Sequence, residues 1–173
     1  MAPSPPTLKS LLTCPPIQQE AGCCGGRTGA PTVHVRSATS ADADVIARLV
    51  SQLGYPVSAD DMPARLERIA NDRRAVVLLA ERDDVVVGLA TAHILSVLNR
   101  SRDVAWLTSL VVDEHQRGTG AGRALVEAVE QFARQEGCER LSVTTHEHMT
   151  GAQAFYVHLG LTQTGRRFGR MLD

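Results

Sequence analysis

The alternation of apolar and polar residues along the chain predicts a mixed α/β domain. Period-two or continuous apolar runs indicate strands, and apolar residues three and four positions apart indicate helices. Strands are expected at Thr32–Arg36, Ala75–Glu81, Val85–Leu95, Val104–Val112, Arg140–Thr145 and Arg166–Leu172. Helices are expected from Ser40 to about Leu53, Ser58 to about Asn71, Thr119 to Glu136 and Thr150 to Leu159. This order predicts a mixed central sheet of six to seven strands with about four helices.

One βαβ unit in this order carries the most distinctive stretch of the chain. Three alternating glycines, Gly118, Gly120 and Gly122, connect the strand Val104–Val112 to the helix Thr119–Glu136. Glycine lets a ligand approach the main chain, and the unpaired N–H groups of a first helical turn attract anions. The loop also lies at the carboxyl end of its strand, where ligands bind in open α/β sheets. The pattern therefore predicts a phosphate-binding loop.

Two common kinds of phosphate loop do not fit these residues. A P-loop needs Gly-Lys-Ser/Thr, whereas Gly122 is followed by Arg123 and Ala124. A dinucleotide fingerprint needs a third glycine at the sixth position, which is Arg123 when counted from Gly118. Both alternatives are excluded on the motif itself.

Composition narrows the function classes further. The chain has 173 residues, 43% of them hydrophobic and 21% charged, with a formal net charge of −1. A nucleic-acid binder usually shows a basic excess, and a membrane span needs about 20 apolar residues in a row, so we expect neither. The four cysteines form no CxxC pair, which favours reduced thiols in a cytoplasmic protein. Residues 1–31 are rich in Pro and Gly without any period, which predicts a disordered leader before a domain at 32–173.

Two longer stretches carry a resemblance to a known family. The run "LVVDEHQRGTGAGRALV" resembles the acetyl-CoA loop of the GNAT N-acetyltransferase superfamily, with the pattern Arg/Gln-x-x-Gly-x-Gly/Ala on Arg117, Gly120 and Gly122. The segment "GAQAFYVHLGL" is similar to the family's second motif, in matching element order. The resemblance covers about Val33 to Asp173 and implies the GNAT-like acyl-CoA N-acyltransferase fold. The ending "FYVHLGLTQTGRRF" is similar to a bacterial subgroup that acts on small amines.

The resemblance implies a reaction and a set of site residues. Acetyl-CoA would be the co-substrate, and a primary amine would attack its thioester directly in a ternary complex. Tyr156 would face the thioester sulfur and supply a proton to the departing CoA. The cofactor-binding residues would be Leu110, Val111 and Val112 along the pantetheine arm, and Arg117, Gly118, Thr119, Gly120, Ala121, Gly122 and Arg123 around the pyrophosphate.

The sequence departs from the family at the position of the general base. Many members carry a carboxylate on the strand before the loop, where this chain has hydroxyls at Thr108 and Ser109. His93, His146 and His148 are the alternative bases. The last two form an "HEH" pair without a third ligand, so no metal is expected.

Some functional alternatives remain open at this stage. A non-catalytic acyl-CoA sensor and an enzyme acting on protein amines both fit the same motifs. The sequence also leaves open whether the chain forms a homodimer.

Overall fold

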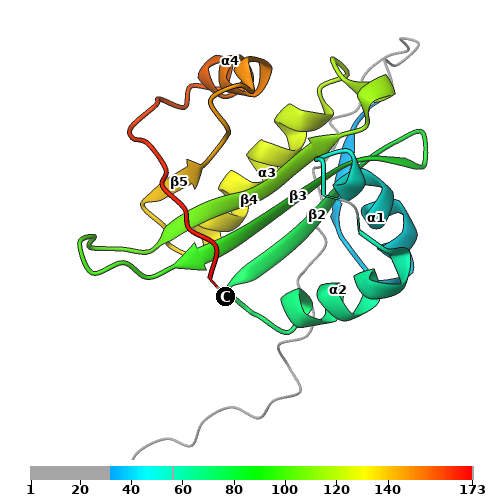
Figure 1. Ribbon diagram of the computed structural model, residues 1–173, viewed down its shortest axis with the longest axis horizontal. Helices are drawn as coiled ribbons and strands as arrows, with labels where there is room; N and C mark the ends of the chain where they lie inside the picture. Colours follow the sequence, from blue (N-terminus) through cyan, green and yellow to red (C-terminus); the bar gives the residue numbers. More distant parts are fainter. Residues whose placement is uncertain (1–31, 56, 173) are drawn as a thin grey trace, which may run out of the picture. The chain divides into compact units, whose positions relative to one another are not determined.

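The computed structural model describes residues 32–55 and 57–172, so the expected leader at 1–31 lies outside the described residues. One five-stranded sheet has the spatial order β1-β2-β3-β4-β5, and only β4 and β5 are parallel (Figure 1). The strands are β1 (His34–Ser37), β2 (Ala75–Arg82), β3 (Val85–Leu95), β4 (Val104–Val112) and β5 (Arg140–Val143). The α-helices are α1 (Ala43–Ser51), α2 (Met62–Ala70), α3 (Ala121–Gln135) and α4 (Thr150–His158).

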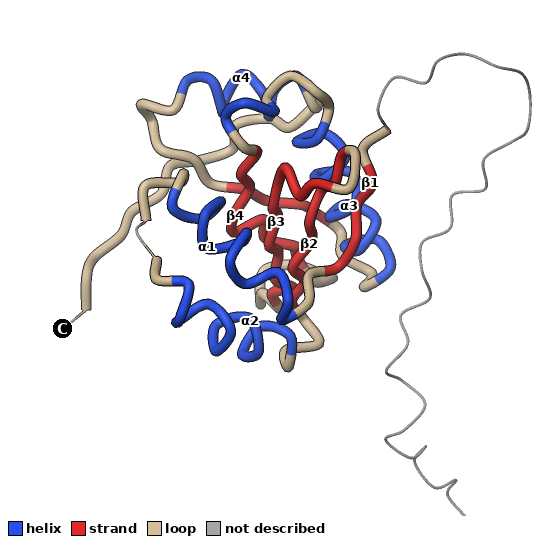
Figure 2. Tube along the Cα trace, turned by 90° about the vertical axis from the view of Figure 1, so that its right-hand side faces the viewer, coloured by secondary structure: helices blue, strands red, loops and turns tan. Residues whose placement is uncertain are grey.

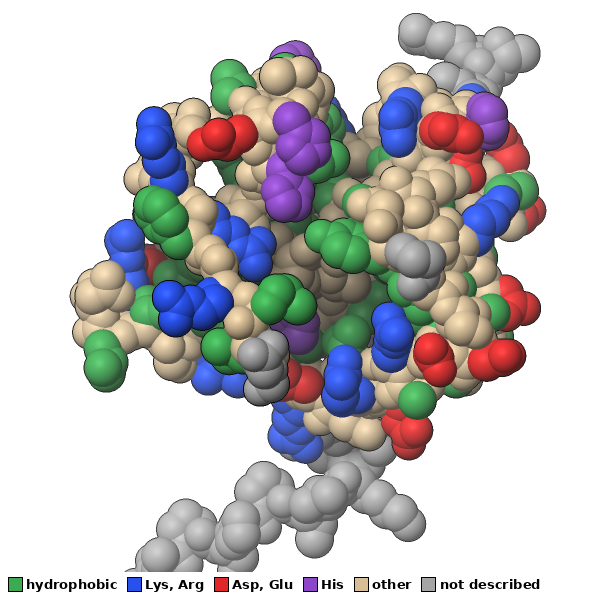
Figure 3. Space-filling model, in the orientation of Figure 1, with side chains coloured by type: hydrophobic (Ala, Val, Ile, Leu, Met, Phe, Trp, Pro, Cys, Tyr) green, Lys and Arg blue, Asp and Glu red, His purple; other side chains and the backbone are tan. Residues whose placement is uncertain are grey.

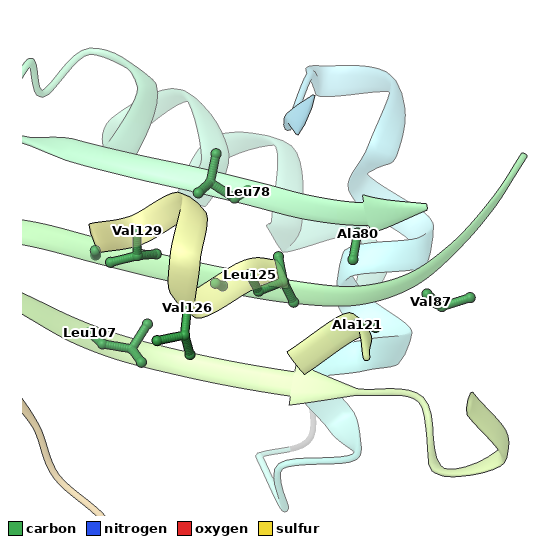
Figure 4. Packing of buried hydrophobic residues seen from close by; sticks show 10 residues of the cluster. Leu78, Ala80, Val87, Leu107, Ala121, Leu125, Val126 and Val129 are labelled. Atoms are coloured by element: carbon green, nitrogen blue, oxygen red, sulfur yellow. The ribbon is translucent and has the colours of Figure 1, made fainter. Parts of the chain in front are cut away.

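The sheet is covered on both faces. Figure 2 shows α1 and α2 on one side and α3 on the other. Successive strand residues point to opposite faces, so Leu78 packs into the cluster beneath α3 while Leu79 packs beneath α1 and α2. Figure 4 shows how α3 lies on the sheet through buried apolar residues that recur at helical spacing: Ala121, Leu125, Val126 and Val129. Because Ala121, the first residue of α3, is part of this core, the packing also holds the glycine loop that precedes it.

The start of α1 is tied to β1 and β2 by a buried carboxylate. A 3-10 turn (Ser40–Asp42) precedes α1, and Thr39 is its N-cap. Ser40, where the sequence predicts the start of a helix, is the first residue of this turn, and a reciprocal capping box joins Thr39 to Asp42. Arg36 on β1 donates to both Asp42 oxygens at 2.8 Å and to Glu81 Oε1 on β2 at 2.7 Å.

The expected number of strands is wrong: the described residues form five, not six to seven. The missing strand is Arg166–Leu172, which has no regular structure. The exposed fractions of Phe168, Met171 and Leu172 are 92%, 90% and 88%. Their spacing lacks the period of two that would bury one strand face, and Gly169 interrupts the segment. The expected four helices and the mixed α/β class are confirmed.

The parallel pair β4 and β5 separates halfway along β4. Their pairing runs from Val104 opposite Arg140 to Leu107 opposite Val143, where β5 ends. From Thr108 onward, no other described strand lies beside the outer edge of β4. At this point the sheet opens, because β4 continues without a partner on its outer edge and the segment from β5 to α4 no longer pairs with it.

Candidate active site

The glycine loop presents a row of free backbone donors at the start of α3. Gly120 is the N-cap with φ of +91°, and Gly118 has φ of +80°, both in the left-handed region that favours glycine. The first helical hydrogen bond runs from Ala124 N to Gly120 O at 3.0 Å. Within the described residues, the N–H groups of 118–123 donate to no other group. Free donors at the positive end of a helix dipole are an arrangement that suits an anion.

The third glycine has a different role. A Cβ added at Gly122 would lie 3.2 Å from Phe155 Cζ, closer than ordinary van der Waals contact. The absence of a side chain therefore lets α4 approach the first turn of α3. This contact brings Tyr156, the next residue of α4, toward the loop.

The outer edge of β4 offers further backbone groups. Asp113 N donates to Val87 O on β3 at 2.8 Å. Because N–H groups alternate in direction along a strand, those of Val112 and Leu110 point away from β3. Since β5 ends opposite Leu107, an extended ligand could pair with this edge.

Tyr156 lies on α4, half-buried against the core cluster that α3 covers. Its ring centroid is 5.4 Å from that of Phe155, in an edge-on arrangement. Burial disfavours the phenolate and raises the pKa of Tyr156 to about 12. The hydroxyl is therefore protonated at neutral pH and is able to donate a hydrogen bond.

The Thr108 hydroxyl on β4 and the Thr91 hydroxyl on β3 form a pair next to the point where β4 and β5 separate. Thr108 is the extra residue of a β-bulge, because Thr91 pairs with Ser109 while Ala92 pairs with Leu107. Thr108 Oγ1 donates to Thr91 O at 3.0 Å, and the two hydroxyl oxygens are 2.7 Å apart. No carboxylate stands at this position of β4.

Two of the three candidate histidines lie together, and the third is on β3. His93 lies two residues beyond Thr91 on β3, so both share a face of the sheet. Its Nδ1 is 3.9 Å from Asp72 Oδ2. His146 and His148 lie in the exposed loop between β5 and α4, with ring centroids 5.3 Å apart.

The arginines of the loop motif are on the surface. Arg117 is exposed, and Arg123 Nη1 is 3.9 Å from Glu127 Oε1, one helical turn away. Among the described residues, no cluster of three or more potential metal ligands is found. Within the same residues, no helix is long and apolar enough to span a membrane.

Comparison with known proteins decides the family. Residues 43–161 match the model of the acetyltransferase (GNAT) family. The chain belongs to the GNAT acetyltransferase family. Together with its curated relatives, this match identifies an acetyl-CoA-dependent N-acetyltransferase and confirms the resemblance found in the sequence.

The relatives of this GNAT protein differ in the amine named for each. An aminoalkylphosphonate N-acetyltransferase of Salmonella typhimurium is 29% identical over 147 residues, covering 82% of this chain and 93% of the relative. An aminoglycoside N(6')-acetyltransferase of Stenotrophomonas maltophilia is 33% identical over 141 residues, covering 79% and 90%. A solved aminoglycoside N-acetyltransferase in complex with CoA has a TM-score of 0.76 at 23% identity, covering 84% and 98%, and shows the same fold.

Two contacts near the candidate site could not be predicted from the sequence. The contact between Gly122 and Phe155 depends on how α4 packs, although the short helix itself was predicted. Arg167 donates to Thr144 Oγ1 at 3.2 Å, just beyond the last paired residue of β5. The only signal was the basic run in a segment expected to be a strand.

Proposed function

We propose that this chain transfers an acetyl group from acetyl-CoA to a primary amine by direct attack in a ternary complex. The observation that carries the proposal is the adjacency of two unpaired backbone surfaces. The free N–H groups of 118–123 adjoin the free edge of β4 at Leu110 and Val112. The first suits a pyrophosphate, and the second suits an extended amide-bearing arm.

The remaining site residues would act on the thioester and its phosphates. Val111 is buried beneath α1 and α2, so its contribution would come from the backbone and from the rigidity of β4. The exposed Arg117 and Arg123 border the loop and would add positive charge near the pyrophosphate. Tyr156 would donate a hydrogen bond to the thiolate of the departing CoA. No cysteine is among the site residues, so no acyl-cysteine intermediate is part of the proposal.

The relatives favour a small-molecule amine as the acceptor. The names of two relatives that the chain spans by about nine-tenths refer to aminoalkylphosphonates and aminoglycosides. The hollow in Figure 3 lies on the face that carries α1 and α2, with histidine side chains beside it. That face also carries the Thr91 and Thr108 hydroxyls, and the acceptor would approach the thioester from there.

The absence of a carboxylate from β4 has a consequence for the proton of the amine. A primary amine with a pKa near 10.4 is neutral in only about one molecule in 2,500 at pH 7. Thr108 and Ser109 do not ionise in this range. We therefore propose that deprotonation passes through water or a weak base, so that kcat/KM rises with pH well beyond 8. A plateau near pH 7 that disappears in His93→Ala, His146→Ala or His148→Ala would contradict this and identify that histidine as the base.

The test of the proposed function is release of the CoA thiol across a panel of acceptors. The panel includes alkylamines, aminophosphonates, aminoglycosides, polyamines and peptides with free amino termini. We expect turnover with at least one small amine and none with peptides. Tight acetyl-CoA binding without turnover of any acceptor would instead support a sensor module. Turnover of peptides alone would support a protein acetyltransferase.

A further inference from the structure

Residues 161–172, which follow α4, cross the face of the sheet that also carries α1 and α2, the face from which the acceptor would approach. Figure 1 shows this segment passing in front of β4 and β3 toward the C-terminus. Two hydrogen bonds hold it beside β5: Arg140 Nη2 donates to Thr164 Oγ1 at 2.8 Å, and Arg167 Nη1 donates to Thr144 Oγ1 at 3.2 Å. Residues 161–172 of this segment contain three arginines and no carboxylate.

One of these arginines lies at the place where the sheet opens. Val143 is the last residue of β5 and is opposite Leu107, so Thr144 is level with Thr108. Val143 packs toward α3, whereas Thr144 accepts its bond from the C-terminal segment, which passes over the opposite face, the one that also carries the Thr91 and Thr108 hydroxyls. The bond to Thr144 thus places the Arg167 guanidinium beside the opening in β4.

The C-terminal segment brings an excess of positive charge to this opening. Within the described residues, no carboxylate forms an ion pair with Arg166, Arg167 or Arg170. Two carboxylates on nearby loops are engaged, since Asp103 pairs with Arg74 and Glu139 pairs with Arg100 at 3.4 Å. Glu147, in the exposed loop that follows Thr144, forms no ion pair within the described residues. Figure 3 shows basic side chains along the C-terminal segment at one border of the hollow.

We propose that Arg167 binds an anionic group on the amine substrate, so that the preferred acceptor is a short primary amine carrying a phosphonate, phosphate or carboxylate. The inference rests on the proposed acetyl transfer and specifies its substrate class. A guanidinium binds such anions through two parallel hydrogen bonds, and one bond to Thr144 leaves most of its donors free. Because Arg167 lies close to the opening of β4, only a short carbon chain fits between the anion and the reacting amine. A polycationic amine would meet like charge at this border.

The substrate class is tested with acceptors that share one aminoethyl group. The series is 2-aminoethylphosphonate, β-alanine, ethanolamine and ethylenediamine, whose second groups run from dianionic to cationic. We expect kcat/KM to be higher for the two anionic acceptors than for ethanolamine, and lowest for ethylenediamine. The ratio between phosphonate and carboxylate shows which anion the site prefers. Equal values across the series would overturn the proposal.

The role of Arg167 is tested by substitution with a matched control. Arg167→Met should lower kcat/KM for the anionic acceptors about 10- to 100-fold, the value of a charged hydrogen bond, and leave ethanolamine nearly unchanged. Arg167→Lys should retain part of the preference, since it keeps the charge and loses the planar fork. Arg134→Met is the control, because Arg134 pairs with Glu130 on the exposed surface of α3 and should change none of these values. Equal anion preference in Arg167→Met and the wild type would overturn the assignment.

A binding measurement separates this inference from the proposed function. Ethylphosphonate carries no amine, and its calorimetric binding to the protein saturated with CoA reports the anion site alone. Binding that weakens in Arg167→Met supports the site even if no amine is acetylated, an outcome that would refute only the proposed function. Undetectable binding, or the same affinity in Arg167→Met, would refute the anion site and leave acetyl transfer standing. Melting temperatures of both variants verify the fold, which we expect to be retained because Arg167 is exposed.

Discussion

At the scale of the single residue, the environment of Tyr156 limits what its hydroxyl can do. Burial raises the pKa of Tyr156 to about 12, whereas a free thiol has a pKa near 8.5. Complete transfer of the phenolic proton to a CoA thiolate would therefore cost about 5 kcal/mol. A hydrogen bond to the developing thiolate needs no such transfer. The residue is thus better suited to stabilising the leaving group than to acting as a strong acid.

Replacement of Tyr156 by Phe tests this role. We expect kcat to fall about 10- to 100-fold with little change in the KM for acetyl-CoA, because the hydrogen bond strengthens only as charge develops on sulfur. The wild type should show no loss of rate from tyrosine ionisation below about pH 11, since the folded pKa is raised rather than lowered. Steady-state kinetics from pH 6 to 11 measure both effects. Identical kcat values for the two proteins would reduce Tyr156 to a packing residue.

At the scale of the element, the N-terminus of α3 can be tested against a glycine at the other end of the same helix. Gly120 and Gly137 both have positive φ, +91° and +72°, and a Cβ at either position would meet no atom within 4 Å. Valine at either site should therefore impose a similar backbone strain, of about 1–2 kcal/mol. Only Gly120→Val should also weaken acetyl-CoA binding, because its side chain would obstruct approach to the loop. Calorimetry that shows equal acetyl-CoA affinity in the two variants would exclude the loop as the pyrophosphate site.

At the same scale, the Arg36 network that joins β1, α1 and β2 predicts how the stability of the protein depends on pH. Two hydrogen bonds from Arg36, with bonds from Thr39, hold the pKa of Asp42 well below its usual range. A carboxylate with a lowered folded pKa stabilises the protein above its unfolded pKa near 3.9, and that contribution is lost as the pH falls below it. Asp42→Asn should lower the free energy of unfolding at pH 7 by about 3 kcal/mol and reduce the loss of stability between pH 4 and 2.

A neighbouring carboxylate provides the control for this measurement. Asp44 is exposed in the first turn of α1 and forms no ion pair within the described residues. Asp44→Asn should change the free energy of unfolding by less than about 0.5 kcal/mol. Urea denaturation at several pH values gives both quantities. Equal stability losses in the two variants would show that the Arg36 network is not what stabilises the start of α1.

At the scale of the whole molecule, local sequence patterns were sufficient to predict an element where one of its stripes or faces is buried. The bounds of β4 agree with the prediction at both ends, and α3 ends one residue from its expected end, because their apolar residues follow the sheet and helix periods. The glycine loop was predictable as well, since its chemistry lies in consecutive residues. The prediction of a final strand at Arg166–Leu172 was wrong, because the apolar residues of this segment are exposed. Arg167 was missed as a site residue because only the path of the C-terminal segment brings it to Thr144.

The boundary of the folded domain supports the last prediction. The family match begins at residue 43, and among the described residues Val33 and Val35 already pack against the cluster beneath α3. We propose that residues 32–173 form the acetyltransferase domain, since residues 1–31 contain no periodic apolar face. Deletion of 1–31 should therefore leave the melting temperature and the acetyl-CoA affinity unchanged. Deletion of 1–37 is the control, and it should lower the melting temperature by several degrees because it removes β1 and the Arg36 partner of Asp42. A comparable drop from the shorter deletion would show that the leader stabilises the domain and that its boundary lies before residue 32.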